Sequence, residues 1–200
     1  MSSPRTTWPH VVVALRAMLV LTVVIGVGYP LLVTGLGRAM PARADGSPVT
    51  DADGRVVGSS LIGQAFTDAD GAPLTAYFQS RPSAAGDGYD AAASSGSNLG
   101  PENPDLVAAV EERRAAVADL EGVDPADVPV DALTASASGL DPHISPAYAE
   151  LQVPRVAAER GLPEDAVRAL VRDATTGPDL GYLGQAGVDV LTLNLALDAQ

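Results

Sequence analysis

The stretch AMLVLTVVIGVGYPLLVTGLG, residues Ala17–Gly37, determines where the rest of the chain can be. It is apolar, and it carries no charged residue between Arg16 and Arg38. Its 21 residues would rise about 31 Å as a helix, which matches the ~30 Å hydrocarbon core of a bilayer. We therefore predict one membrane-spanning helix with its core at 17–37, and Val11 is the earliest start that we consider.

A bend is expected inside this predicted helix. Pro30 removes one backbone donor, and Gly26 and Gly28 lie close to the carbonyl that it leaves free. Membrane helices tolerate such residues because the freed carbonyl is satisfied locally. We expect a kink near Gly26.

A cleaved signal peptide is the alternative interpretation. Arg5 and Arg16 form a positive leader, and the sequence Ala42-Arg43-Ala44 has the A-x-A form of a cleavage site. A signal peptide has an apolar region of roughly 7–15 residues, and this run is longer. The length favours a retained anchor.

The charge of the chain is distributed very unevenly. All 25 acidic residues follow Arg38. Residues 39–200 contain these 25 and nine arginines, which gives this region a formal charge of −16. Such a surface repels nucleic acid and anionic lipid, so nucleic acid is not an expected partner. The chain has no Cys and no Lys, which excludes disulfides, thiolate metal sites, a Walker A lysine and a Schiff base.

We divide the chain into a short N-terminal tail (1–10), the transmembrane helix (11–37), a linker (38–54) and one soluble domain (55–200). The sequence Thr-Asp-Ala-Asp-Gly occurs twice, at 50–54 and 67–71. A calcium loop would need a glutamate at its twelfth position, where these copies have Ile62 and Gln79. Two Asp-Gly turns are the preferred interpretation.

Strand and helix patterns alternate in the predicted domain. Strands are predicted within Arg55–Phe66, at Ala76–Gln79 and, from the alternation of its leucines, at Val188–Asp198. Three helices are predicted. The first runs from the N-cap Asn103 to Gly122, the second from the N-cap Ser145 to Gly161, and the third begins at Pro163. The fold class is therefore one α/β or α+β domain behind a single transmembrane helix.

The connections between these elements are small and polar. Segments 81–83 and 94–101 are predicted loops, and the second could cradle an anion, although a plain surface connection is the preferred interpretation. Residues 131–140 are predicted to bury little. Residues 155–171 have the outline of a helix-turn-helix, but the acidic domain favours helix packing over DNA recognition.

Three catalytic residue types occur close together in Asp141-Pro142-His143-Ile144-Ser145. This set suggests a hydrolase, but triad members usually come from separate elements, and the sequence has no G-x-S-x-G elbow. Besides His143, the only other histidine is His10, so a histidine metal site is not expected, and no metal site or catalytic residue is predicted.

Several motifs taken together resemble a known family. They are YFQSRPSAAG (77–86), SGSNLGPENPDL (95–106), DALTASASGLDPHISPAYAELQVPRVAAERG (131–161) and VLTLNLALD (190–198), behind one N-terminal span. In content and order they resemble the C subunit of the bacterial Kdp potassium-transporting P-type ATPase, over nearly the whole chain.

The resemblance implies a non-catalytic accessory subunit of a high-affinity potassium uptake complex. Its partners would be the ATP-hydrolysing P-type subunit, the channel-like potassium-binding subunit, a small membrane subunit and the membrane itself. The family is described as a catalytic chaperone that raises the ATP affinity of the hydrolysing subunit. Potassium would be the ion that the complex transports, ATP would act through the complex, and no covalently bound cofactor is expected.

The family motifs also supply candidate contact residues for a partner or nucleotide. They are Gln152, Arg155, Asp141, His143 and Ser145. The resemblance implies a single-pass protein in the cell membrane with a cytoplasmic N-terminus and an extracytoplasmic domain. The positive-inside count is a tie, with two arginines on each side of the span. The alternatives are a membrane-tethered hydrolase using His143, or an extracytoplasmic binding module released by signal cleavage.

Overall fold

The computed structural model describes residues 4–200, so residues 1–3 of the predicted tail lie outside the described part of the chain. The chain divides into two compact units, of which the first ends at Ser47 and the second is Pro48–Gln200. The boundary falls inside the predicted linker (38–54), because strand β1 (Pro48–Thr50) already belongs to the second unit.

The first unit is a long helix followed by one short turn of helix. It consists of α1 (Pro4–Val23), the π-helical turn η1 (Val24–Gly28), α2 (Tyr29–Arg38) and α3 (Pro41–Ala44). Its stretch Trp8–Arg38 is long and apolar enough to cross a membrane, and none of its most apolar window is buried by other parts of the unit. The single predicted span is confirmed as a helix, and the helix begins before Val11.

The π-helical turn lies where the kink was predicted. The Tyr29 amide donates to the Val24 carbonyl five residues back, one residue further than in an α-helix. Pro30 follows directly and has no amide to donate. Such turns are a known cause of helix bending, so the bend itself stays a prediction with a local structural basis.

The second unit begins with a hairpin of β1 (Pro48–Thr50) and β2 (Val56–Ser59), which pair antiparallel. The Asp51 carboxylate closes the turn by accepting hydrogen bonds from the amides of Asp53 and Arg55, at 3.0 and 2.8 Å. In the second copy of the repeat, the Asp68 carboxylate accepts from two amides in the same way. The predicted Asp-Gly turns are confirmed.

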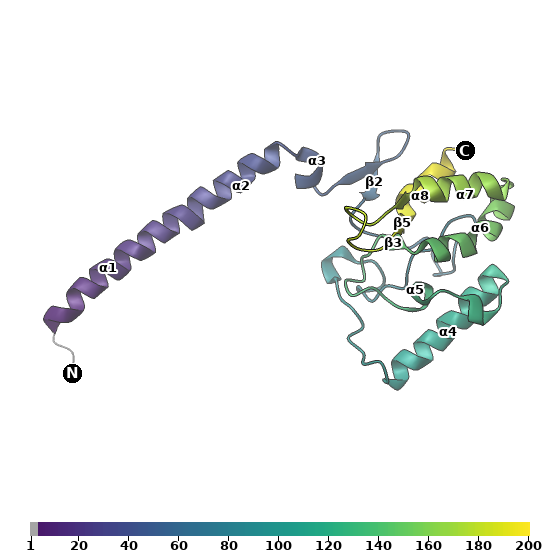
Figure 1. The fold of residues 1–200 in the computed structure, drawn as a ribbon, viewed down its shortest axis with the longest axis horizontal. Coiled ribbons are helices and arrows are strands. Elements are labelled where there is room, and N and C mark those ends of the chain that lie inside the picture. The colour runs from purple at the N-terminus through teal and green to yellow at the C-terminus, as the bar shows by residue number, and fades with distance from the viewer. Residues whose placement is uncertain (1–3) are drawn as a thin grey trace. The chain divides into compact units, whose positions relative to one another are not determined.

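Helices form most of the regular secondary structure of the domain. They are η2 (Ala91–Ala93), α4 (Pro104–Glu121), η3 (Pro125–Asp127), α5 (Val130–Leu133), α6 (Pro146–Arg160), α7 (Glu164–Asp173) and α8 (Val190–Asp198). The predicted caps are confirmed: Asn103 accepts from an amide of α4, Ser145 accepts from one of α6, and Gly122 and Gly161 end these helices in the left-handed conformation. Figure 1 shows α6 between α4 and α7.

A small sheet joins distant parts of the domain. Strands β3 (His143–Ile144), β5 (Gly187–Asp189) and β4 (Thr175–Thr176) pair antiparallel in the order β3-β5-β4. Val188 of the central strand lies opposite both Ile144 and Thr175. The fold is therefore α+β, as predicted, with the sheet beside the start of α6.

The predicted C-terminal strand is wrong for residues 190–198, which form α8. Asp189 caps the helix by accepting a 2.7 Å hydrogen bond from the Thr192 amide. Its buried residues include Val190, Leu193, Asn194 and Leu197, a helical spacing. Apolar residues at nearly every position fit a strand and a helix equally well, and the Asp189 cap decides for the helix.

The predicted strand at 76–79 is also wrong, because this segment pairs with side chains and not with another strand. Gln152 accepts a hydrogen bond from the Gln79 amide (2.6 Å) and donates to the Gln79 carbonyl (3.2 Å). Asn194 accepts from the Phe78 amide (2.9 Å) and donates to its carbonyl (3.0 Å). We call Gln152 and Asn194 the amide clamp, since they satisfy the backbone as a neighbouring strand would.

The prediction that residues 131–140 bury little is also wrong. Ala132 and Leu133 in α5 are almost fully buried, and so is Ser136. Ala132 and Leu133 join a mainly aliphatic core, to which α6 contributes the most buried residues and α8 the next most. Small side chains can still belong to a core when the backbone comes close, which composition does not reveal.

Candidate functional site

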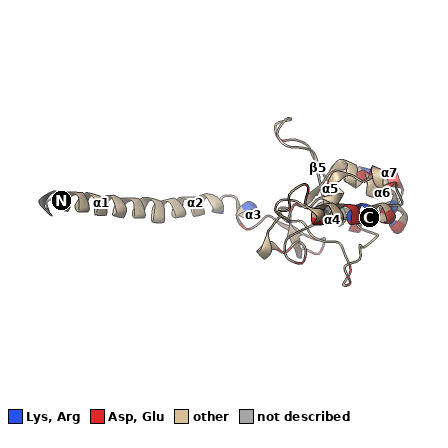
Figure 2. Cartoon of the chain, turned by 90° about the horizontal axis from the view of Figure 1, so that it is seen from below, with Lys and Arg blue, Asp and Glu red and all other residues tan. Residues whose placement is uncertain are grey.

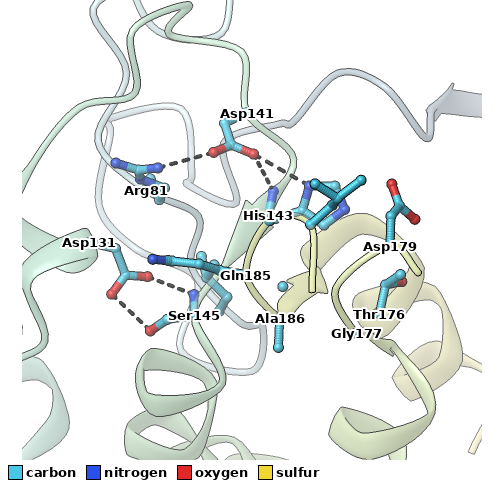
Figure 3. Close-up of a pocket in the computed structure, with 14 residues that line it drawn as sticks. Arg81, Asp131, Asp141, His143, Ser145, Thr176, Gly177, Asp179, Gln185 and Ala186 are labelled. Atoms are coloured by element: carbon cyan, nitrogen blue, oxygen red, sulfur yellow. Dashed lines mark hydrogen bonds and ion pairs between the residues drawn. The ribbon is translucent and has the colours of Figure 1, made fainter. Parts of the chain in front are cut away.

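The segment Asp141–Ser145 forms one wall of a polar cavity. The Asp141 carboxylate makes a 3.0 Å ion pair with Arg81 and accepts the His143 amide at 3.0 Å. The His143 ring also faces Asp141, with 3.4 Å between Nδ1 and the carboxylate. Figure 3 shows Asp141 between Arg81 and His143, so these residues form one connected group.

Ser145 belongs to a different group. Its hydroxyl donates to Asp131 (2.8 Å) and accepts from the Tyr148 amide (3.0 Å), while its own amide donates to Asp131 (2.7 Å). The hydroxyl thus serves to begin α6, and its proton is directed at Asp131 and not at His143. This geometry does not form the nucleophile-base pair that a hydrolase requires.

Arg81 connects Asp141 with the segment that contains Thr134. Besides the ion pair, it donates to the Thr134 carbonyl at 3.2 Å, and its Nε is buried without a hydrogen-bond partner in the described structure. Its backbone carbonyl accepts a 2.9 Å hydrogen bond from the Tyr89 hydroxyl. Burial raises the pKa of Tyr89 to about 12.

The cavity has a volume of about 400 Å³. Its opposite wall is formed by Thr176 at the end of β4 and by the segment that connects β4 to β5, including Asp179, Leu183 and Gln185. Figure 3 shows Thr176 and Asp179 on the other side of His143 from Arg81 and Asp131. The structure therefore brings Asp141, His143 and Ser145 to one cavity, and it adds Arg81, Asp131 and Asp179.

Gln152 and Arg155 lie elsewhere, in the amide clamp region. The Gln152 side chain is 0% exposed, and Arg155 donates to its amide oxygen at 2.9 Å. Arg155 also donates to the carbonyls of Thr75 and Tyr77. Every polar group of Gln152 therefore has a partner within the chain. Contact of either residue with a partner or nucleotide stays a prediction.

Arg155 also neutralises a buried acid. Its Nε lies 3.0 Å from the Glu121 carboxylate, whose side chain is 0% exposed and whose second oxygen has no hydrogen-bond partner in the described structure. Burial raises the pKa of Glu121, and the hydrogen bond and charge of Arg155 act in the opposite direction. Burial, with a smaller contribution from Glu121, also raises the pKa of Tyr148.

The sequence interpretation missed several residues that position these groups. The sequence patterns place Asp131 in a segment without a predicted role, Asn194 in a predicted strand and Arg81 in a predicted loop. The sequence did contain a signal for Asn194, which lies within an apolar run. If such a run is buried, its polar side chain needs a hydrogen-bond partner inside the protein. Nothing local in the sequence indicated that Arg81 reaches Asp141, which is 60 residues away.

What the cavity can do follows from its groups. Within residues 4–200, no group of three or more His, Cys, Asp or Glu side chains is arranged to hold a metal ion. The Asp131 and Asp141 carboxylates are engaged by donors of the chain itself. The cavity is thus a polar recess whose acidic groups are held in place by the chain itself.

Comparison with known proteins identifies the family. The family model described as "KdpC: K+-transporting ATPase, c chain" matches residues 11–199. A protein of Kineococcus radiotolerans named "Potassium-transporting ATPase KdpC subunit" is 59% identical, with 92% of this chain and 90% of that protein covered. Proteins of the same name from Caulobacter vibrioides and Mycobacterium tuberculosis are each 52% identical, with 96% and 92% of this chain and 93% and 95% of those proteins covered. Because both the span and the domain are matched, the chain belongs to the KdpC family of potassium-transporting ATPase subunits.

Proposed function

We propose that this chain is a non-catalytic accessory subunit of an ATP-driven potassium uptake complex, which it assembles and stabilises. Family membership over nearly the whole chain carries this proposal. Its chemistry agrees, since a chain without Lys has neither a P-type phosphorylation motif DKTG nor a phosphate-binding lysine. Catalysis would then belong to another subunit.

The membrane helix would pack against helices of the partners. Figure 2 shows α1 and α2 almost free of charged residues, whereas acidic and basic residues occur on the domain. Apart from its chain neighbours and the backbone of its own helix, a Cβ placed on Gly35 would meet no atom within 4 Å, and one on Gly26 would meet only the Thr22 side chain at 3.8 Å. The chain's own fold does not require these glycines, and small residues are what close approach of two membrane helices needs.

We further propose that the N-terminus is cytoplasmic and the domain extracytoplasmic. The short leader before the span supports this orientation, although the arginine count is balanced. An effect on ATP affinity would then be a coupling across the membrane and not a direct nucleotide contact. The burial of Gln152 agrees with an indirect effect.

Co-purification from detergent tests the assembly role. The chain is expressed with the partner subunits, one of which carries the affinity tag. The proposal expects a stoichiometric complex, and a chain that elutes alone as a stable monomer would contradict it. The mass of the purified chain separates the anchor from the cleaved alternative, since cleavage would give a protein beginning near Asp45.

The ATP role is tested separately. Potassium-dependent ATP hydrolysis is measured against ATP concentration, for the complex with and without this chain. A catalytic chaperone should lower the apparent KM for ATP with little change in kcat. An unchanged KM would remove this part of the proposal. Single cysteines introduced before and after the span, in a chain without native Cys, report the orientation in intact cells.

A further inference from the structure

The connection between β4 and β5 exposes unusually large apolar side chains. We call residues 177–186 the tip loop. Its turn is closed by hydrogen bonds between Asp179 and Leu183 in both directions, at 2.8 and 2.9 Å. Leu180 and Tyr182 are 81% and 74% exposed, and Leu183 is half exposed. A hydrogen-bonded turn thus holds Leu180 and Tyr182 mostly in the solvent, where they contribute little to the core of their own domain.

Leu180 is also held in an unfavourable backbone conformation. Its φ is +55°, in the left-handed region that branched residues avoid and glycine adopts freely. The neighbouring Gly181 shows that the loop uses glycine at a left-handed position where no side chain is needed. Strain that no contact within the chain offsets is typical of functional sites.

The tip loop borders an acidic cavity. Asp179, Leu183 and Gln185 line the cavity described above, together with Arg81, Asp131 and Asp141. One arginine against three aspartates leaves a formal charge of −2 when His143 is neutral. Only Asp141 among the three has an arginine partner in the described structure. A cationic group entering the cavity would complete this charge balance.

The charge of the tip loop and its surroundings favours a protein partner over a lipid surface. Residues 173–200 contain no Lys or Arg, and the whole region after Arg38 is strongly acidic. Peripheral segments that bind anionic bilayers carry basic residues beside their apolar ones, and this loop carries Asp179. Exposed aromatic and aliphatic side chains beside a polar pocket are instead the composition of protein-protein contact centres.

We infer that the tip loop and the acidic cavity form the surface through which this domain docks on another subunit of the complex. That subunit would present an apolar patch to Leu180 and Tyr182 and one basic side chain to the cavity. The inference rests on the proposed function, since it takes the partner from there, and it adds the place of contact.

Site-specific photo-crosslinking tests the place of contact. Benzoylphenylalanine replaces Tyr182 in the full chain, and in a matched control it replaces Val130, which is similarly exposed in α5. The complex is irradiated in native membranes. An adduct between the Tyr182 position and a partner subunit, absent at the Val130 position, is the expected result. An adduct with lipid, no adduct, or equal adducts at both positions would overturn the inference.

Variants then test the two contributions in the purified complex. Leu180→Ser with Tyr182→Ser should lower the amount of chain retained after dilution by about tenfold, the effect of a lost contact centre. The control pair Leu61→Ser with Val130→Ser, also exposed, should change retention less than twofold. Asp179→Asn should reduce the sensitivity of retention to salt, whereas Asp173→Asn, exposed on α7, should not.

One further variant distinguishes a loss of docking from a loss of folding. Leu180→Gly removes the side chain where glycine is favourable, so the free chain should keep its melting temperature while retention falls. If the unmodified chain is not retained by its partners, the proposed function fails. If it is retained and the tip variants are retained equally, only the docking surface is wrong.

Discussion

The amide clamp and the tip loop differ in what their side chains do for the backbone. At the clamp, buried side chains of α6 and α8 satisfy the backbone of Phe78 and Gln79. At the tip loop, backbone groups form hydrogen bonds with each other, and the side chains of Leu180 and Tyr182 are exposed to solvent. The first arrangement serves folding and the second leaves binding surface available. Variants should therefore affect stability at the clamp and association at the tip loop.

The largest loss of stability is expected at the ion pair beside the clamp. Arg155→Met leaves the Glu121 carboxylate buried without a partner and should lower the free energy of unfolding by about 3–5 kcal/mol. Urea denaturation of the full chain in detergent, followed by circular dichroism, measures it. Arg168→Met is the control, because its acidic partners are exposed and the loss should be much smaller than that of Arg155→Met. Equal losses would contradict this ranking.

The clamp itself should come next. Asn194→Leu keeps the side-chain size but leaves the Phe78 amide and carbonyl unpaired, which should cost about 2–4 kcal/mol. Gln185→Leu makes the same kind of change on the exposed tip loop and should be nearly neutral. The same denaturation measurement applies. A neutral Asn194→Leu would mean that segment 76–79 does not depend on side-chain pairing.

Tyr89 should show an intermediate effect with a pH signature. Tyr89→Phe removes one hydrogen bond to the Arg81 carbonyl and should cost about 1 kcal/mol near pH 7. The folded-state pKa is raised from 10.0 to about 12, so the unfolded chain loses its proton first. The stabilisation is complete below pH 10 and is lost as pH rises towards 12.

Melting temperatures against pH for parent and Tyr89→Phe chains check this sign. The difference between the two should shrink as pH rises through that window. A difference that grows with pH would show that the folded state favours the ionised tyrosine.

The smallest effect on stability should occur at the tip loop. Leu180→Gly relieves a left-handed leucine, worth about 1 kcal/mol, but the added freedom of glycine in the unfolded chain offsets about the same amount. The free energy of unfolding should therefore stay within about 0.5 kcal/mol of the parent. A large loss in the isolated chain would mean that Leu180 has a folding role.

Local signals in the sequence predicted the span and the helix ends well. An uncharged run of bilayer length, Asn103 and Ser145 as caps and Gly122 and Gly161 as stops each act within a few residues. These features depend on local backbone chemistry, so they survive any tertiary arrangement. The main helices of the α+β fold were predictable for the same reason, whereas the strands at 76–79 and 190–198 were predicted wrongly.

The parts that could not be predicted depend on distant partners. Segment 76–79 looks like a strand because its partners imitate one, and those partners are 73 and 116 residues away. Residues 190–198 fit both periods; the Asp189 cap favours the helix, and the contact of Asn194 with Phe78, 116 residues away, buries one side of it. Likewise, Asp141 and His143 were noticed for the residue types of a triad, but the connection of Arg81 to Asp141 and of Ser145 to Asp131 required the fold.

The most direct measurement of the central claim is potassium-dependent ATP hydrolysis by membranes that contain the partner subunits with or without this chain. We predict that activity is lost without it, returns with the full chain, and does not return with a chain lacking residues 1–47, because the anchor is needed for assembly. Full potassium-dependent activity without the chain, or full rescue by the anchorless chain, would contradict the account.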